Sequence, residues 1–473
     1  MQKHAITKVS ALLAAGLVLF VGHGEARAAG PLGPQGSRIN TSQYNVDLYQ
    51  GPVLATTRIT GMGGAFTAVA EDTDAIPFNP AAASVRSPYS HNKTDYDITG
   101  GITLPSSVGR TDFDNNGTVG FTYKNFYWLT GGGILQFGHV GMGFIASFQN
   151  YELGVPGQAV PLPGSASNEV VQKVAIRVVR FDPVASYGLF NDQLHVGGGL
   201  RAAGFFGVGR SGAPGADADN ERLLLQSFAL GVQAGALWQP PDLPLRIGVA
   251  LRSPAWSVQA DSDSGRVQKN ADGDRVIGNI FLPDELSLPW EAEAGIAVQL
   301  WKRPLNIPWM DEDQVPKPDT ERWRLTTKNG EPEPEWRGAR RLIKARYKAI
   351  PRQKVLLTAS TVITGPTKNA VGLESMLSQT VDRSGQTTVV GVRGGVETEV
   401  IPWWLVLRAG SYLEPTRYKE GEARIHGTAG LDVRVLRWSV FDLFDEDTLF
   451  RLSLSGDLAR DYFGWGIGAG FIH

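Results

Sequence analysis

The sequence predicts an all-β protein: a 14-stranded antiparallel transmembrane β-barrel, with a compact N-terminal segment that could plug its lumen. Three observations lead to this fold class. A secretory leader opens the chain, segments of about ten residues with period-two alternation follow it, and the composition is rich in glycine and aromatics. The chain has 57 Gly, 12 Trp, 12 Tyr, 20 Phe and no Cys among 473 residues.

Residues 1–28 have the pattern of a signal peptide. Lys3 and Lys8 precede an apolar run over residues 11–21, and small residues follow at Ala26 and Ala28. We therefore expect cleavage near Ala28. No later run of 18 apolar residues could form a transmembrane helix. A secreted chain of this kind is either a soluble periplasmic β-sandwich or a barrel in the outer membrane.

Alternation is clearest in the second half of the chain. In residues 450–458, Phe450, Leu452 and Leu454 alternate with Arg451 and Ser453. Fourteen such segments start near Thr94, Phe126, Val140, Val174, Leu194, Ser227, Leu245, Leu288, Lys354, Val389, Leu405, Arg424, Leu449 and Tyr462. An even number of strands of this length is what a single-chain outer-membrane barrel requires. Soluble strands are usually shorter, which disfavours the sandwich.

The connections between these segments alternate in length. Short ones at residues 191–192, 240–242 and 401–402 are expected on the periplasmic side, and long polar ones at 154–172, 209–222, 254–284 and 365–386 outside. Aromatic residues collect at segment ends, for example Trp238, Trp290, Trp301, Trp403 and Trp404. These positions match the aromatic girdles of a membrane barrel.

The face opposite the apolar one carries charges of both signs. By alternation, the lumen-facing charges are Glu291, Glu293, Arg393, Glu397, Glu399, Arg408, Asp432, Arg434, Arg451 and Asp457. They could line a polar path, or they could pair with the plug. We favour ion pairs between wall and plug, because isolated buried charges are costly.

Residues 29–90 precede the barrel (91–473) and do not alternate. They contain Gly63 and Gly64, an Ala-Glu-Asp turn ending at Asp72, and Asn79-Pro80-Ala81. Small residues of this kind let backbone pack closely, and Asn-Pro breaks a helix or turn.

These motifs resemble the N-terminal signature of the FadL/TodX family of outer-membrane transporters of hydrophobic compounds. The stretches 194–206, 228–254 and 400–410 look similar as well. The resemblance implies a barrel plugged by an N-terminal hatch, with Asp72, Asn79 and Pro80 positioning the hatch. It also implies uptake from outside and lateral release into the membrane through a gap in the third strand, residues 140–152. Secretion-associated barrels share the signature, so it does not identify the substrate.

A polar insertion, residues 302–353, interrupts the barrel pattern. It has 13 Lys+Arg, 8 Asp+Glu and 7 Pro. Its first part is typical of an extended linker, and residues 336–350 are basic and possible helix formers. Parity of the strands assigns it to the periplasm. We favour a solvated loop over a docking surface for a periplasmic partner or for lipid headgroups.

The sequence gives little support for other chemistry. A formal charge of −2 disfavours nucleic-acid binding. Asp112, Asp114, Asn116 and Gly117 match the start of a calcium loop, but Tyr123 replaces the bidentate acid. We favour a hairpin loop there. A separate acidic loop, with Asp272 and the nearby acids 261, 263 and 274, is a weaker candidate for calcium bridging. No metal, cofactor or catalytic motif is expected, and His195 and His426 are assigned to the lumen.

The expected function is passive outer-membrane transport of hydrophobic molecules such as long-chain fatty acids. Apolar burial would bind the ligand, at a pocket near the barrel mouth. Outer-membrane lipid and lipopolysaccharide would surround the barrel. The alternatives are a secretion-associated or structural barrel that binds an exported protein, and an open porin.

Overall fold

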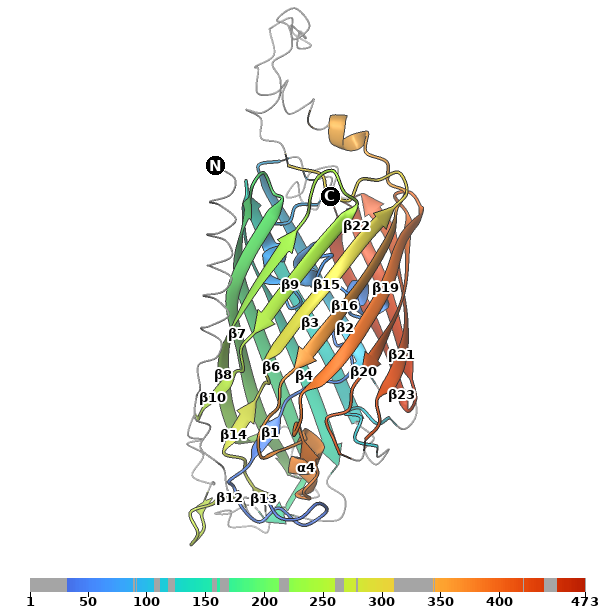
Figure 1. The fold of residues 1–473 in the computed structure, drawn as a ribbon. Coiled ribbons are helices and arrows are strands. Elements are labelled where there is room, and N and C mark those ends of the chain that lie inside the picture. The colour runs from blue at the N-terminus through green and yellow to red at the C-terminus, as the bar shows by residue number, and fades with distance from the viewer. Residues whose placement is uncertain are drawn as a thin grey trace, which may run out of the picture.

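The fold is a closed antiparallel barrel in a computed structural model (Figure 1). The structure describes residues 32–87, 90, 92–105, 111–117, 124–154, 160–161, 170–211, 221–259, 268–277, 280–309, 343, 345–419, 421–437 and 449–472. The barrel strands are β2 (Thr94–Pro105), β3 (Lys124–Phe137), β4 (Val140–Gly154), β6 (Val170–Leu189), β7 (Leu194–Ser211), β8 (Glu221–Trp238), β9 (Leu245–Arg252), β15 (Glu291–Leu300), β16 (Val355–Thr364), β19 (Val389–Ile401), β20 (Leu405–Glu414), β21 (Arg424–Arg437), β22 (Leu449–Ala459) and β23 (Tyr462–Ile472).

The predicted 14 strands are confirmed, and each pairs with its neighbours in chain order. The first and last strands close the barrel, with Thr99 opposite Gly470. Three predicted starts were displaced by three residues or more. The strands predicted from Val174 and Ser227 begin earlier, at Val170 and Glu221, and the one predicted from Leu288 begins at Glu291. The latter strand starts late because Pro289 has no N–H for the ladder.

The predicted alternation places apolar side chains on the outside. Leu452 and Leu454 of β22 are 45% and 46% exposed, whereas Arg451 and Ser453 between them are buried. No helix among the described residues is long and apolar enough to cross a membrane. A closed barrel with an apolar outer surface satisfies its backbone in lipid, so the protein is a barrel of the bacterial outer membrane.

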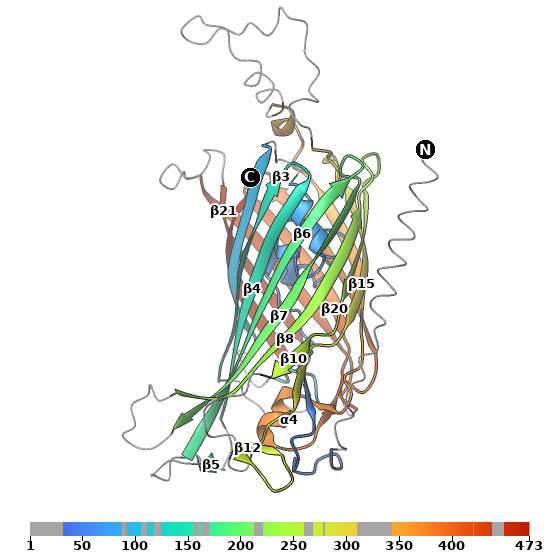
Figure 2. The same ribbon diagram turned by 90° about the vertical axis from the view of Figure 1, so that its left-hand side faces the viewer.

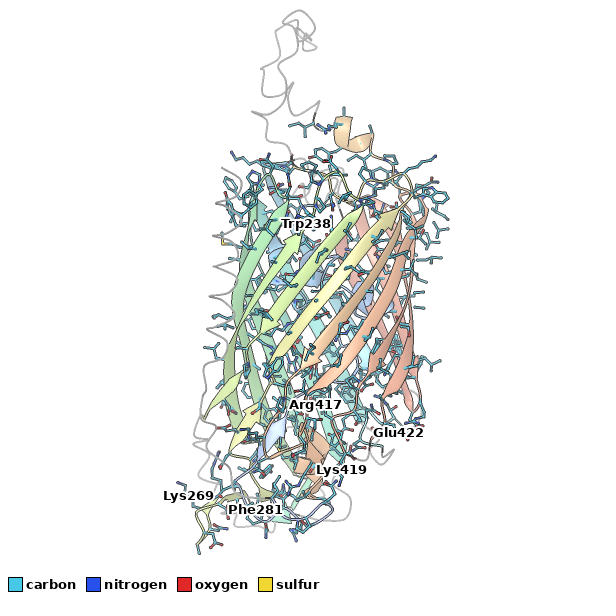
Figure 3. All side chains as sticks on the ribbon, viewed as in Figure 1. Trp238, Lys269, Phe281, Arg417, Lys419 and Glu422 are labelled. Atoms are coloured by element: carbon cyan, nitrogen blue, oxygen red, sulfur yellow. The ribbon has the colours of Figure 1, made fainter. Side chains whose placement is uncertain are left out.

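The two ends of the barrel differ. Trp238 lies at one end, and Lys269 and Phe281 lie at the other (Figure 3). The short turns and the C-terminal end of β23 share the end of Trp238, which we therefore assign to the periplasm. Trp301 and Trp404 are also exposed there. At the extracellular end, β6, β7 and β8 project beyond the other strands (Figure 2).

A small cap covers the extracellular mouth. It contains a four-stranded sheet of β1 (Asn45–Asp47), β14 (Glu285–Ser287), β17 (Ala370–Val371) and β18 (Arg383–Ser384), and the helix α4 (Leu373–Ser378). β1 runs parallel to both β14 and β17. Short strands β5 (Val160–Pro161), β10 (Trp256–Gln259), β11 (Gln268–Lys269), β12 (Arg275–Ile277) and β13 (Ile280–Phe281) complete the described part of this end.

Asp47 ties the cap together. Its carboxylate accepts a hydrogen bond from Arg417 Nε at 2.7 Å and one from the Ser384 hydroxyl at 3.0 Å. Both side chains of this ion pair are buried. The N-terminal chain is therefore held to the loops of the barrel before it enters the lumen.

The wall is continuous where the family resemblance implied a gap. β4, the third barrel strand, pairs with β6 in one register from Val140 to Gly154, so the expected gap is absent from these residues. The ladder is interrupted instead between β6 and β7. Pairing stops after Phe181 and resumes at Val184, so Asp182 and Pro183 are unpaired with β7. Proline cannot donate to the ladder.

The chain after the cap runs inside the barrel, as the blue ribbon in Figures 1 and 2 shows. We call residues 48–87 the luminal segment. It forms the short helix α2 (Thr57–Gly61) and the 3-10 turns η1 (Thr73–Ala75) and η2 (Pro80–Ser84). Every residue of these three elements is buried.

The prediction that the insertion, residues 302–353, forms a solvated loop was wrong for its two ends. Leu305, Asn306 and Trp309 near one end are buried, and so are Ile343 and Tyr347 near the other. Residues 343 and 345–348 are helical, and the Tyr347 hydroxyl donates to the Pro308 carbonyl at 3.3 Å. The insertion ends thus pack against one another at the periplasmic mouth. Residues 310–342, which include the predicted linker, lie outside the described residues.

Candidate functional site

Glycines of the wall let the luminal segment lie against the barrel backbone. A Cβ on Gly197 of β7 would lie 2.4 Å from the Pro80 carbonyl oxygen, and one on Gly248 of β9 would lie 2.1 Å from that of Thr67. Gly141, Gly395 and Gly410 make similarly close approaches to the segment. No L side chain fits at such distances, so five strands are shaped to receive this segment.

The residues of the N-terminal motif hold the segment in its bent path. Gly63 and Gly64 have φ of 62° and 75°, which glycine adopts without strain. Asn79 caps η2, since its Oδ1 accepts from Ala81 N at 3.0 Å. Its amide nitrogen donates to Thr67 O at 2.9 Å and to Ala236 O of β8 at 3.1 Å.

Pro80 occupies the first position of η2, where its lack of an N–H costs nothing. Ala81 is fully buried. Asp72 has a φ of 65° and accepts from Arg58 Nη1 at 2.6 Å. The six motif residues therefore lie along the segment and join it to itself and to the wall.

One carboxylate, Glu397 of β19, is the centre of a buried charge network. It accepts from Arg58 of the luminal segment at 2.9 Å and from Arg408 of β20 at 2.6 Å, and it also contacts Lys354 Nζ. Arg408 makes a two-point contact with Asp432 of β21 at 2.6 and 2.7 Å.

The network reaches the luminal segment at two further points. Arg451 of β22 lies 3.7 Å from Asp432 and 3.3 Å from Asp74 of η1. Glu71, beside Asp72, accepts from Arg58 at 3.1 Å and from Arg246 of β9 at 2.8 Å. Removing one member of such a buried pair typically costs about 3–5 kcal/mol.

A second group of charges lies nearer the extracellular end. Glu293 lies 3.3 Å from Arg393 and 3.5 Å from Arg252, and Glu291 lies 3.4 Å from Arg201 and Arg252. Nearer the periplasm, Arg434 lies 3.4 Å from Glu399. Nine of the ten predicted lumen charges thus have an ionic partner, and some of these partners belong to the luminal segment. The tenth, Asp457, contacts His426 and is described below.

The structure joins two further anchors that the sequence did not reveal. His195 Nδ1 lies 2.8 Å from the Ser84 hydroxyl, and its Nε2 lies 3.1 Å from the Asp192 carbonyl and 2.9 Å from Gln239 Nε2. Ser84 and His195 are 111 residues apart, and no local pattern connects them. Both side chains are buried.

The other anchor centres on His426. Its two ring nitrogens face Asp457 at 2.8 Å and Glu414 at 2.6 Å. Tyr412 stacks on the ring and donates to Asp457 at 2.6 Å, and its hydroxyl accepts from Val53 N at 3.1 Å. The luminal segment is therefore bonded to β20 as well.

The periplasmic half of the lumen contains a charged cavity of about 840 Å³. Its lining includes Arg58, Asp97, Glu397, Arg408 and Arg451, together with Arg303 and Arg352 from the insertion ends. Charges of both signs line it. This half of the lumen offers an apolar molecule no favourable surface.

The extracellular half is different. A cluster of buried apolar side chains fills it, among them Phe113, Phe126, Tyr151, Phe205 and Leu225. Two cavities, of about 560 and 880 Å³, lie beside the chain at Leu48–Gln50. The 560 Å³ cavity at the mouth has several aromatic walls, whereas the 880 Å³ cavity is lined both by apolar residues such as Leu288 and by the second group of charges.

The loop that resembled a calcium site is a turn stabilised by its own backbone. Asp112 accepts from Asn116 N at 3.1 Å and Gly117 N at 2.9 Å. Asp114 accepts from the Tyr418 hydroxyl at 2.7 Å. Among the described residues, no group of three or more His, Asp or Glu is arranged to hold a metal ion.

Comparisons with known proteins give distant structural similarities. No family model and no curated protein matches the sequence. The P. putida toluene transporter TodX is similar over 89% of this chain and 98% of its own, with 10% identity and a TM-score of 0.46. A Pseudomonas aeruginosa FadL homologue covers 94% and 98%, with 13% identity and a TM-score of 0.44. The CymD monoaromatic hydrocarbon channel covers 89% and 97%, with 11% identity and a TM-score of 0.45.

Proposed function

We propose that this protein is a passive outer-membrane transporter for hydrophobic molecules such as long-chain fatty acids. In this proposal the luminal segment is a hatch, and release is lateral, into the membrane. The observation that carries it is the apolar and aromatic packing at the extracellular mouth, above a lumen that the luminal segment and buried charges occupy. An apolar ligand gains about 25 cal/mol per Å² of apolar area buried at the mouth, and would lose this gain among the charges of the lumen.

The packing of the luminal segment favours a gated transporter over an open porin. A general porin has a water-filled lumen, whereas this segment is bonded to the wall through Asn79, Arg58, Ser84 and Val53. An apolar ligand that enters from outside meets this segment before the charged cavity. Lateral release avoids that cavity and requires no energy coupling.

The interruption between β6 and β7 is the position we propose for lateral release. The 880 Å³ cavity reaches the wall there, since Asp182, Arg201 and Ala202 line it. Outside, Phe181 and Leu200 are 44% and 46% exposed to lipid. Fewer backbone hydrogen bonds hold the two strands together at this point than elsewhere along their length.

The exit can be tested by cross-linking, because the natural chain has no cysteine. F181C/A202C joins opposed residues of β6 and β7 beside the interruption. The matched control, V249C/A294C, joins opposed residues of β9 and β15. We expect oxidation to stop uptake of labelled palmitate by cells lacking their own transporter in the first variant only, and a reductant to restore it.

A second variant tests the hatch. Deleting the motif around Asn79, in a barrel that still folds and shifts on heating in gels, should abolish gated uptake. Uptake that survives both the deletion and the F181C/A202C cross-link would contradict the proposal. Absence of uptake with a folded natural chain would remove fatty acids as substrates.

The insertion keeps a second function open, a barrel that binds an exported or periplasmic protein. Its ends close the periplasmic mouth, where Arg352 lies over the Trp403 ring and Asn306 accepts from Arg246 at 2.8 Å. Deleting residues 310–342 separates the two functions. Loss of a copurifying partner with normal uptake would assign the insertion to binding rather than transport.

A further inference from the structure

Two cavities of the extracellular half meet at one arginine. The 560 Å³ cavity at the mouth and the 880 Å³ cavity in the lumen are both lined by Leu48, Tyr49, Gln50 and Arg180. Residues 48–50 are the chain that enters the lumen from the cap, and Arg180 projects from β6. A ligand passing from one cavity to the other would pass Arg180.

Arg180 differs from the other arginines of the lumen described above. Among the described residues, no carboxylate forms an ion pair with it, although Arg201, Arg252 and Arg393 all have one. Its Nε is buried and has no hydrogen-bond acceptor there. Its Nη2 donates to the Leu48 carbonyl at a long distance, 3.4 Å. A buried donor nitrogen without an acceptor is costly unless a ligand supplies one.

A second donor without an acceptor lines the mouth cavity. Gln149 is 1% exposed, and its Nε2 has no partner among the described residues. The amide oxygen of Gln149 is already used, since Gln50 Nε2 donates to it at 2.6 Å and the Tyr151 hydroxyl at 2.7 Å. Two N–H donors therefore lack an acceptor around one cavity. An oxyanion is the group that would satisfy both.

Four aromatic side chains also line the mouth cavity, beside Asp47, Asp114 and Arg417. They are Tyr49, Phe113, Tyr151 and Tyr418. Behind them the apolar cluster is packed closely, with ring centroids of Phe126 4.7 Å from Phe113 and 4.5 Å from Tyr151. Flat ligand rings stack well on such walls, whereas a long acyl chain would need an extended apolar space behind them.

We propose that Arg180 and Gln149 form an oxyanion subsite, and that the preferred ligand is a compact aromatic carboxylic acid of one or two rings. The inference rests on the proposed transport function and narrows its substrate class. The guanidinium would bind the carboxylate while the ring stacks in the mouth cavity. The same charge would then lead the ligand past residues 48–50 into the lumen.

The charges around this cavity and around Arg180 determine its pH dependence. On the lumen side, Asp182 and Glu291 interact electrostatically with Arg180, and at the mouth Glu374 interacts with Asp114. Asp47 and Arg417 neutralise each other as an ion pair. Asp114 in the loop after β2 would repel an anion, but burial raises the pKa of its carboxyl to about 7. Below that pH Asp114 is neutral and a possible donor, so the proposed site binds an aromatic acid more tightly at pH 6 than at pH 8.

The test compares two probes of one shape, 2-naphthoate and the neutral 2-methylnaphthalene, with the full mature chain in lipid nanodiscs. Equilibrium dialysis gives their dissociation constants. Arg180→Met should raise the dissociation constant of 2-naphthoate about tenfold to hundredfold, which is the value of one charge-assisted hydrogen bond. It should leave the dissociation constant of 2-methylnaphthalene unchanged. Gln149→Leu should have the same selectivity with a smaller effect. Arg177→Met is the control, because alternation places Arg177 on the opposite face of β6.

Each result decides between the proposals. If Arg180→Met weakened the binding of both probes equally, Arg180 would have a structural role, and the proposed subsite would be overturned. Palmitate binding without 2-naphthoate binding by the natural chain would also overturn it, and would leave the proposed transport function intact. Absence of binding and uptake for all three ligands would instead refute the transport function itself.

Discussion

The substitution Arg246→Met tests whether buried ion pairs hold the luminal segment in the barrel. Arg246 Nη1 donates to Val69 O and to Glu71 Oε1, both at 2.8 Å, while Nε donates to Asn306 and Nη2 donates to Leu305 O. The side chain is 2% exposed. Methionine fills similar space but leaves Glu71 without one of its two cations. Breaking such a pair costs about 3–5 kcal/mol.

The assay is urea unfolding of the folded barrel in lipid vesicles, followed by tryptophan fluorescence. Arg246→Met should lower the free energy of unfolding by about 3 kcal/mol or more. The control is Arg460→Met, because the ion pair of Arg460 with Glu422 is largely exposed and should contribute less than about 1 kcal/mol.

A double-mutant cycle with Glu71→Gln isolates the pair. In the double variant Glu71→Gln removes the carboxylate that has lost its partner. The loss in free energy of unfolding should therefore be smaller than the sum of the two single losses, by about 1 kcal/mol or more. The recovery is partial because Arg58 also contacts Glu71. Strict additivity, or a loss below about 1 kcal/mol for Arg246→Met alone, would refute the proposed anchoring.

Two further predictions concern the packing of the luminal segment against the wall and the stability of the extracellular mouth. Gly197→Val should displace the luminal segment, because even a Cβ at Gly197 would lie 2.4 Å from Pro80 O; higher ion conductance in planar bilayers would demonstrate this, and unchanged conductance would contradict it. Burial raises the pKa of Asp114 to about 7 and that of Glu374 to about 9. The folded state therefore holds more protons than the unfolded one, and the mouth should lose stability as pH rises from about 5 to 9. Hydrogen exchange of residues 111–117 should accelerate over that range by more than the intrinsic base-catalysed rise, and an equal excess in a D114N/E374Q variant would show another cause.

The barrel could be predicted from the sequence because its signal is local. Each strand repeats an outward apolar and inward polar alternation, as at Leu452 and Arg451, and this determines both the strand and its orientation. Strand starts were less certain. Glu221 begins β8 six residues before the predicted start, because this strand continues beyond the apolar band where alternation fades.

The anchors of the luminal segment could not be predicted, because they join residues far apart in the chain. Ser84 and His195 have no spacing rule, and neither do Val53 and Tyr412, 359 residues apart. Alternation predicted that His195 and the wall charges face the lumen, but it could not identify their partners. The buried ends of the insertion were missed because its composition, rich in charge and proline, is typical of solvated chain.

The parallel pairing of β1 has a consequence for how the protein is assembled. Residues 45–47 leave the secretion machinery early. Their strand partners, residues 285–287 and 370–371, and the ion-pair partner of Asp47, Arg417, all follow much later in the chain. Contacts of such long sequence separation form late in folding. The mouth can therefore close only after most of the chain has been inserted, so a truncated or stalled barrel stays uncapped.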